Sequence, residues 1–529
     1  MKHIFKISFQ IILLLSFSAV SLSAQTLKEA IKLSDNEQYE SAASAFDKLM
    51  KSEPINGDNY FYAGENFIGL ENADSAKIIF QKGVEIAPEN PLNYVGLGAL
   101  LWYKNDTAAK KFFSKALELS KSKNATVLLK IAEVYIKSDT KNISEAFILL
   151  NTAAKKEPKN PEVYILMGDA FLAQANGSQA IVYYEKASAL DPNSTKALLR
   201  TGQLYGRARN FPLSFEYYQK ANAIDSSFAP AYREKAEFYY NAQQVEKAIA
   251  QYKKYLQLNK NLSARIRYAS FLFLNKQYAN AIAEMQEIQK HDSSKVVLYR
   301  LLAYSYFETG DYVNGLVNIN KFFDRVEKSK VKVLPSDYQY QGKLLSKTGQ
   351  DSLAILTLTK AIELDSTQID LYNEIGTLNY KLKKYPQAIA AFEKRIFLRN
   401  GGSANDFNAL GRAYYYNKEY HKSDSVFAKL IEGKPELPVG YFWRARSNSK
   451  LDPETKTFAA KPYYEAYIER AQGDMAKNKK DLIEAYSYMG YYFAATKDYA
   501  SAKSIYTKAL ELDPENAAAK AFMASPQGK

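Results

Sequence analysis

The sequence repeats itself with a period of about 34 residues along most of its length. Residues 161–194 show the unit best, because large residues recur at helical spacing and small ones lie between them: Tyr164, Phe171 and Tyr184 are large, and Gly168, Ala180 and Ala187 are small. Pro192 follows near the end of the unit, where it stops a helix because proline has no amide hydrogen. We therefore expect each unit to form two antiparallel helices, whose backbones approach closely where the small residues lie.

These residues, together with the stretch AFLAQANGSQAIVYYEKASALDP around them, resemble the tetratricopeptide repeat. Four further segments match along their full length, and weaker units fit between them: 57–90, 195–228, 404–437 and 483–516. The resemblance implies an all-α fold, a helix-turn-helix solenoid that winds as a right-handed superhelix of about 14 repeats.

Breaks in the pattern divide the chain. The unit that starts at Asn124 is longer by about two residues near positions 139–142, and residues 326–335 interrupt the array. We therefore predict a signal peptide at 1–24, an N-terminal array at 25–325, an interruption or hinge at 326–335 and a C-terminal array at 336–516. Residues 517–529 are expected to form a capping helix and tail over the last unit.

The first 24 residues have the layout of a secretory signal peptide. Lys2 and Lys6 precede an apolar run, and small residues lead to a cleavage site after Ala24. A retained membrane anchor is the alternative, but polar residues interrupt the run and its densest part, 11–15, is short. No later segment is apolar enough to span a membrane. We expect an exported protein that is periplasmic and peripheral at the outer membrane.

The composition excludes several classes of site. The chain has no cysteine and three histidines, His3, His291 and His421, which excludes disulfides, thiolate nucleophiles and Cys/His zinc sites. No GxxxxGK[ST] phosphate loop is present. A Ser-His-Asp triad would have to bring together residues far apart in the sequence, and no feature of the sequence supports that. The net charge of +14 is spread without long runs of like charge, which is typical of solvated helix faces. We predict no enzyme activity, no catalytic residue, no cofactor, no metal and no nucleic-acid partner.

The resemblance also implies where a partner binds. In this family the first helix of each unit lines a concave groove, and the groove positions here carry arginine and aromatic residues: Arg200, Arg207, Arg233, Tyr240, Arg300, Tyr304, Arg412, Tyr415, Trp443 and Arg446. Such side chains are frequent interface anchors, which favours an acidic or aromatic extended peptide. The alternative is that each of them is solvated or paired within the chain.

The predicted function is a non-enzymatic periplasmic scaffold for protein–protein interaction. It would bind envelope proteins or extended peptides in its groove and serve outer-membrane or secretion complex assembly. Two alternatives stay open from the residues alone. One is a cell-wall or glycan-binding module that uses the tyrosines and Trp443, and the other is a periplasmic chaperone for exported chains.

Overall fold

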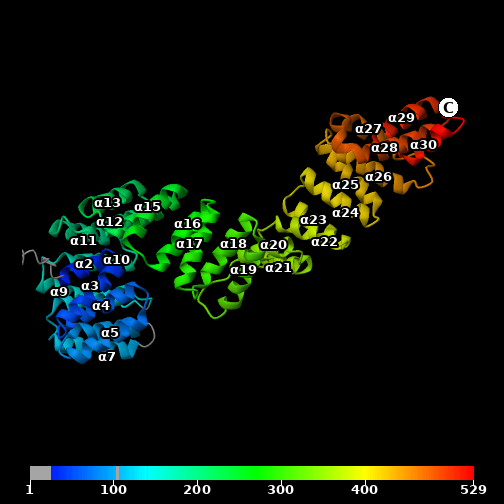
Figure 1. Cartoon of the computed structure of the whole chain (residues 1–529). Helices are drawn as coiled ribbons and strands as arrows, with labels where there is room; N and C mark the ends of the chain where they lie inside the picture. The colour runs from blue at the N-terminus through cyan, green and yellow to red at the C-terminus, as the bar shows by residue number, and fades with distance from the viewer. Residues whose placement is uncertain (1–25, 103–105, 140) are drawn as a thin grey trace, which may run out of the picture. The chain divides into compact units, whose positions relative to one another are not determined.

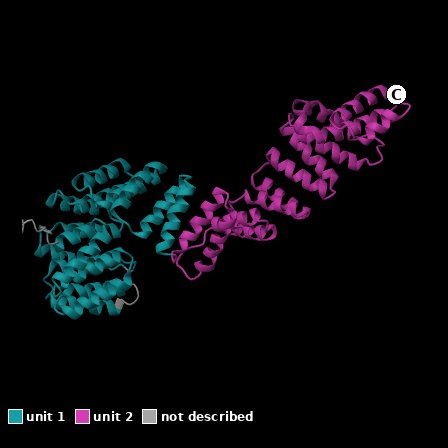
Figure 2. Ribbon diagram, in the orientation of Figure 1, with its two compact units in different colours: residues 1–292 teal, residues 293–529 magenta. Residues whose placement is uncertain are grey.

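The computed structural model describes residues 26–102, 106–139 and 141–529, and within these residues it contains helices and no strand. The predicted signal peptide at 1–24 lies outside the described residues. Two compact units make up the chain, residues 1–292 (unit 1) and residues 293–529 (unit 2), coloured separately in Figure 2.

Unit 1 consists of eight successive helix pairs in the order that Figure 1 labels. They are α2 (Leu27–Asp35), α3 (Tyr39–Ser52), α4 (Gly57–Gly69), α5 (Ala73–Ile86), α6 (Pro91–Leu101), α7 (Asp106–Leu119), α8 (Ala125–Lys137), α9 (Ile143–Lys156), α10 (Pro161–Ala173), α11 (Gly177–Leu190), α12 (Thr195–Arg207), α13 (Phe211–Ile224), α14 (Ala229–Asn241), α15 (Val245–Leu258), α16 (Leu262–Leu274) and α17 (Tyr278–His291).

Unit 2 consists of six pairs and a last helix that packs on the final pair. They are α18 (Val296–Thr309), α19 (Tyr312–Val326), α20 (Pro335–Lys347), α21 (Asp351–Leu364), α22 (Leu371–Lys381), α23 (Tyr385–Leu398), α24 (Ala404–Tyr416), α25 (Tyr420–Gly433), α26 (Pro438–Leu451), α27 (Lys461–Ala471), the short 3-10 helix η1 (Gln472–Asp474), α28 (Met475–Ala495), α29 (Tyr499–Leu512) and α30 (Ala517–Ala524).

The all-α solenoid predicted from the repeat is therefore confirmed. The interruption predicted at 326–335 falls inside unit 2, where residues 327–334 link α19 to α20. The hinge at this position and the handedness of the superhelix stay predictions. None of the described helices combines the length and the apolar character that a membrane crossing requires.

Side-chain caps set where many of these helices begin. An asparagine precedes the helix, and its side-chain oxygen accepts a hydrogen bond from a backbone amide of the first turn, at Asn72, Asn90, Asn124, Asn142, Asn160, Asn176 and Asn210. The turn inside a pair holds one residue in the left-handed region, with φ between 55° and 60° at Glu37, Glu71, Ala175, Arg209 and Gln243. The same turn geometry therefore recurs from pair to pair.

The small residues of the repeat allow an aromatic ring to lie against the facing helix. A Cβ atom added to Gly168 would lie 2.3 Å from Cε1 of Tyr184, which is buried. The same relation joins a glycine of the first helix to an aromatic ring of the second in other pairs: Gly64 with Phe80, Gly98 with Phe113, Gly202 with Tyr218, Gly376 with Phe392, Gly411 with Phe427 and Gly490 with Tyr506. Each of these seven pairs thus has a close contact that depends on both the glycine and the aromatic ring.

The first turn of unit 1 contacts helix pairs that lie far along the chain. The turn between α2 and α3 hydrogen-bonds to residues that follow it by 189 to 218 positions in the chain. Glu37 accepts hydrogen bonds from Arg233 and from the hydroxyl of Tyr255, and Asn36 donates to Asp225. Figure 1 shows the dark blue helix α2 beside α10, and residues of both helices line one cavity. We call this set of contacts, which joins residues 32–38 to residues 225–255, the ring closure.

Candidate functional site

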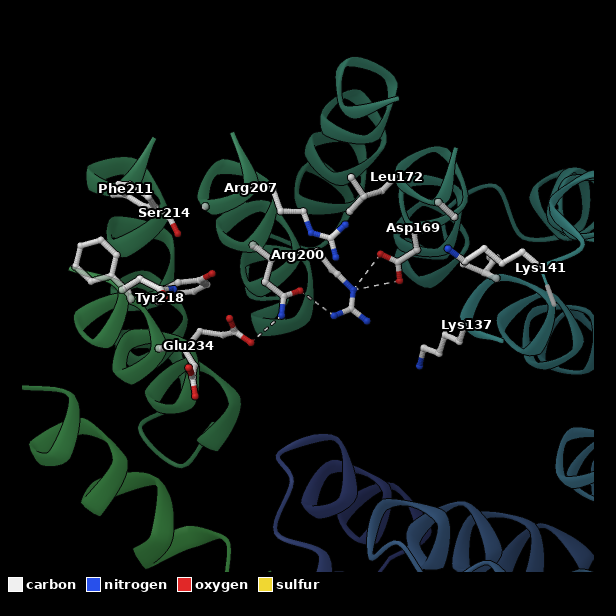
Figure 3. A pocket seen from close by; sticks show the side chains of 17 residues that line it. Lys137, Lys141, Asp169, Leu172, Arg200, Arg207, Phe211, Ser214, Tyr218 and Glu234 are labelled. Atoms are coloured by element: carbon white, nitrogen blue, oxygen red, sulfur yellow. Dashed lines mark hydrogen bonds and ion pairs between the residues drawn. The ribbon is translucent and has the colours of Figure 1, made fainter. Parts of the chain in front are cut away.

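A cavity lies in unit 1, on the side formed by the first helices of successive pairs. Its volume is about 690 Å³, and residues of α8, α10, α12, α13 and α14 line it. Figure 3 shows Lys137 and Lys141 at one end, Arg200, Arg207 and Asp169 in the middle, and Phe211 and Tyr218 at the other end. We call this space the unit 1 cavity.

An ion pair lies in the middle of the unit 1 cavity. The guanidinium of Arg200 lies 3.0 Å from Asp169, whose carboxylate also accepts a hydrogen bond from the hydroxyl of Tyr184 at 2.7 Å. Burial and the neighbouring carboxylate both raise the pKa of Tyr184. Burial acts to lower the pKa of Arg200, but the Asp169 carboxylate, together with Tyr184 and Glu133, raises it above its usual value. This predicted groove residue is therefore fixed within the chain.

A second cavity, of about 240 Å³, contains charged residues that face each other. Lys130 lies 2.7 Å from Glu65 and 3.5 Å from Glu133, and Lys196 pairs with Glu162. Burial raises the pKa of Glu65, although Lys130 acts to lower it. Four carboxylates (Asp35, Glu65, Glu133 and Glu162) and two lysines line this cavity, so its lining is net negative, whereas the lining of the unit 1 cavity holds more cations than carboxylates.

The ten predicted groove residues all lie on the first helix of a pair, on α12, α14, α18, α24 and α26. Four of them are held by a carboxylate of the same unit: Arg200 by Asp169, Arg233 by Glu37 at 2.9 Å, Arg300 by Asp337 at 2.6 Å and Arg446 by Glu484 at 2.5 Å. Tyr240 packs on Phe271, with 5.4 Å between the ring centres. Arg207 is exposed and lines the unit 1 cavity.

Four of the predicted residues come together in unit 2. The rings of Tyr415 and Trp443 meet edge to face at 5.2 Å, and the guanidinium groups of Arg412 and Arg446 lie 5.2 Å and 5.0 Å from the centre of the Trp443 ring. Trp443 is 7% exposed and belongs to a buried hydrophobic cluster. The indole ring therefore packs the core of unit 2 and presents little surface to a partner.

Arg300 and Tyr304 serve the segment between α19 and α20. Asp337, which is fully buried, accepts two hydrogen bonds from Arg300, one from the hydroxyl of Tyr304 at 2.7 Å and one from the backbone amide of Leu334. Arg300 also donates to the carbonyl of Lys332 at 2.6 Å. These contacts attach residues 332–337 to α18.

Several residues that shape these sites are not among the residues predicted from the sequence. Asp337 stands in the first turn after Pro335, where an acidic residue is favoured at a helix start, so its position carried a signal. Lys141 lies in the stretch 139–142, where the repeat is longer than usual. No sequence pattern marked Glu37 as a site residue, because it occupies an ordinary turn position and its partner Arg233 is far away in the sequence.

Comparisons with known proteins agree with this architecture. Models of the tetratricopeptide repeat match residues 165–227 and 483–516. The C-terminal part of a TPR repeat-containing protein from Cytophaga hutchinsonii is 40% identical, and the match covers 49% of this chain and 100% of that one with a TM-score of 0.44. No curated protein matches the chain in sequence.

Two more distant solved structures are also similar. A tetratricopeptide repeat protein from Parabacteroides merdae is 18% identical over 49% of this chain and 99% of that one, with a TM-score of 0.33. A thermophilic TPR protein from Thermus thermophilus is 22% identical over 35% of this chain and 99% of that one, with a TM-score of 0.31. The repeat pattern, the helix pairs and the 40% identical relative together establish that this chain belongs to the tetratricopeptide repeat family.

Proposed function

We propose that this chain is a non-catalytic scaffold that is exported and holds envelope proteins, or extended segments of them, on the concave side of unit 1. Tetratricopeptide arrays suggest protein–protein interaction, since stacked helix pairs build an extended concave surface. The observation that carries the proposal is the unit 1 cavity of about 690 Å³, lined by the first helices of four successive pairs. A role in outer-membrane or secretion complex assembly is part of the proposal.

The size and lining of the cavity suit a short stretch of extended chain. Polar and charged residues along it can hydrogen-bond a peptide backbone, and aromatic residues at one end can take a side chain. Trp443, which a glycan-binding role would use for stacking, packs in the core of unit 2. We therefore favour a protein segment as the ligand.

In-cell photo-crosslinking tests the scaffold role. The photoreactive amino acid p-benzoylphenylalanine would replace Asn241, which lines the cavity, and in a control it would replace Ile148, an exposed residue of the second helix α9. We expect mass spectrometry to find one dominant envelope protein crosslinked at position 241 and absent at 148. A diffuse set of unfolded chains at position 241, or retention of the protein on purified sacculi without a protein partner, would contradict the proposal.

The chain has no cysteine, so a single introduced cysteine is a unique label for testing export. Lys253→Cys places a thiol on an exposed position of α15. We expect a membrane-impermeant maleimide to label this variant in cells whose outer membrane has been made permeable and whose inner membrane is intact. Labelling that requires lysis of the inner membrane would contradict export.

A further inference from the structure

The carboxylates that line the unit 1 cavity all have ion-pair partners, whereas two of its lining cations have none among the described residues. Each lining carboxylate lies within ion-pair distance of an arginine of the same unit: Asp169 is 3.0 Å from Arg200, Glu237 is 2.5 Å from Arg267, and Glu234 is 3.1 Å from Arg233, which it shares with Glu37. These three carboxylates are therefore paired within the chain and attract a further cation only weakly.

Two lining cations have no such partner. Arg207, in the last turn of α12, and Lys141, after α8, are exposed, and neither has a carboxylate within ion-pair distance among the described residues. A third lining cation, Lys137, pairs with Glu133 on its own helix. Figure 3 shows Lys137 and Lys141 at the same end of the cavity. Arg207 lies between this lysine end and the aromatic end. This half of the cavity thus carries uncompensated positive charge.

The opposite end carries aromatic rings among its polar residues. Phe211, at the start of α13, is 43% exposed and meets Phe238 of α14 edge to face, with 6.0 Å between the ring centres. Both rings line the cavity. An exposed aromatic pair beside a polar channel is a common recess for an apolar side chain of a partner.

We propose that the unit 1 cavity recognises an extended protein segment that carries an acidic side chain and an apolar side chain about three residues apart. This inference rests on the proposed scaffold function and names the chemistry of its partner. The spacing follows from the helices, because Arg207 and Phe238 lie on α12 and α14, neighbouring first helices roughly 10 Å apart, and an extended chain rises about 3.3 Å per residue.

Charge also favours a protein segment over a nucleic acid. A nucleic acid presents a continuous row of phosphates, and its affinity comes from neutralising many of them. The cavity offers two unpaired cations, and the carboxylates of Glu234 and Glu237 stand in the same lining. One or two acidic side chains match two unpaired cations, whereas a row of phosphates carries more charge than these two cations can neutralise.

Selection from a library tests the inference without knowledge of the natural partner. Phage that display random 12-residue peptides would be selected against the purified full chain and against the double variant Arg207→Gln/Lys141→Gln. The matched control is Arg209→Gln/Lys159→Gln, which removes the same charge at exposed positions outside the cavity lining. Phe211→Ala tests the aromatic end, with Phe397→Ala, an exposed aromatic of unit 2, as its control.

We expect the selected peptides to be enriched in Asp or Glu about three positions from a large apolar residue. Their affinity, measured by fluorescence anisotropy, should fall at least tenfold in the double variant and in Phe211→Ala, remain within twofold in the controls, and weaken as salt is added. Peptides without acidic residues, affinities unchanged by the double variant, or no selected peptide at all would overturn the inference. The scaffold function would then still be decided by crosslinking at position 241, so the two can fail separately.

Discussion

The carboxylate of Glu37 accepts two hydrogen bonds from the guanidinium of Arg233, which lies 196 residues farther along the chain. Glu37 stands in the left-handed position of the first turn, with φ of 55°, so its side chain projects from the tip of that turn. The hydroxyl of Tyr255 donates to the same carboxylate at 2.8 Å, and burial and this charge both raise the pKa of that hydroxyl. One turn residue thereby closes unit 1 across seven helix pairs.

The first prediction concerns the ring closure. Glu37→Gln removes the charge that Arg233 faces and turns one of the two accepting oxygens into an amide donor, and we expect it to cost about 1–3 kcal/mol because partly buried donors of Arg233 and Tyr255 then lack an acceptor. Native-state hydrogen exchange should then become faster in residues 26–38. Asp47→Asn, which breaks the exposed pair with Lys51, is the control and should cost less than about 0.5 kcal/mol. Unchanged exchange in the first helix pair would show that packing alone closes the ring.

The second prediction concerns the link between α19 and α20. Asp337→Asn leaves the guanidinium of Arg300 without its buried counter-charge, a change that typically costs about 3–5 kcal/mol. We expect limited proteolysis to cut residues 327–334 faster in this variant. The control is Asp370→Asn, because Asp370 is exposed and pairs with Arg399 at the surface. If the two variants are cut at equal rates, the Asp337 contacts do not hold the link.

The third prediction concerns the close approach of the helices in a pair. A Cβ atom at position 168 would lie 2.3 Å from the ring of Tyr184, so Gly168→Ala forces the ring or the helix to move. We expect a loss of about 1–3 kcal/mol in the local unfolding free energy, read from hydrogen exchange in α10 and α11. Gly177→Ala in the same pair meets only Leu204 at 3.4 Å and should be close to neutral. Equal effects at both positions would contradict the packing argument.

The fourth prediction concerns a buried lysine. Lys235 is 7% exposed, its Nζ lies 4.3 Å from the centre of the Tyr232 ring, and it has no carboxylate partner among the described residues. Burial, with a smaller effect from Lys254, lowers its pKa from 10.5 to about 8. Other repeats place methionine or leucine at the corresponding position, as at Met167 and Leu410.

Because the pKa of Lys235 is lower in the folded chain, the unfolded chain binds more protons between pH 8 and 10.5, and stability rises with pH through this range. We expect Lys235→Met to be more stable than the native chain below pH 8, by on the order of 2–3 kcal/mol, and this advantage to disappear towards pH 10.5. The control Lys253→Met changes an exposed lysine of the next helix. An advantage that does not vary with pH would mean that Lys235 titrates normally.

Most of the fold could be predicted from the sequence because its contacts are local. Gly168 and Tyr184 are 16 positions apart, and the Asn caps and left-handed turns each act within one repeat. A contact that recurs within every unit leaves a periodic trace in the residue pattern, and a single unit is enough to recognise it. The helix assignment of all ten groove residues follows from that same register.

The helix pairs and their approximate number follow from the repeat in the sequence, because every unit carries the same local pattern. Which charged side chains find a partner depends on how the helix pairs pack against one another in three dimensions. Arg233 and Arg207 are both predicted groove residues on neighbouring first helices, near the start of α14 and at the end of α12, yet Arg233 is held by Glu37 and Arg207 has no carboxylate partner in the described chain. The reason is physical: the curvature of a solenoid accumulates from small rotations at each repeat, and these are set by packing detail that leaves no periodic pattern in the sequence. The contacts of the ring closure join residues nearly two hundred positions apart, so they depend on that accumulated curvature. Whether a cation such as Arg207 meets a carboxylate depends on it in the same way.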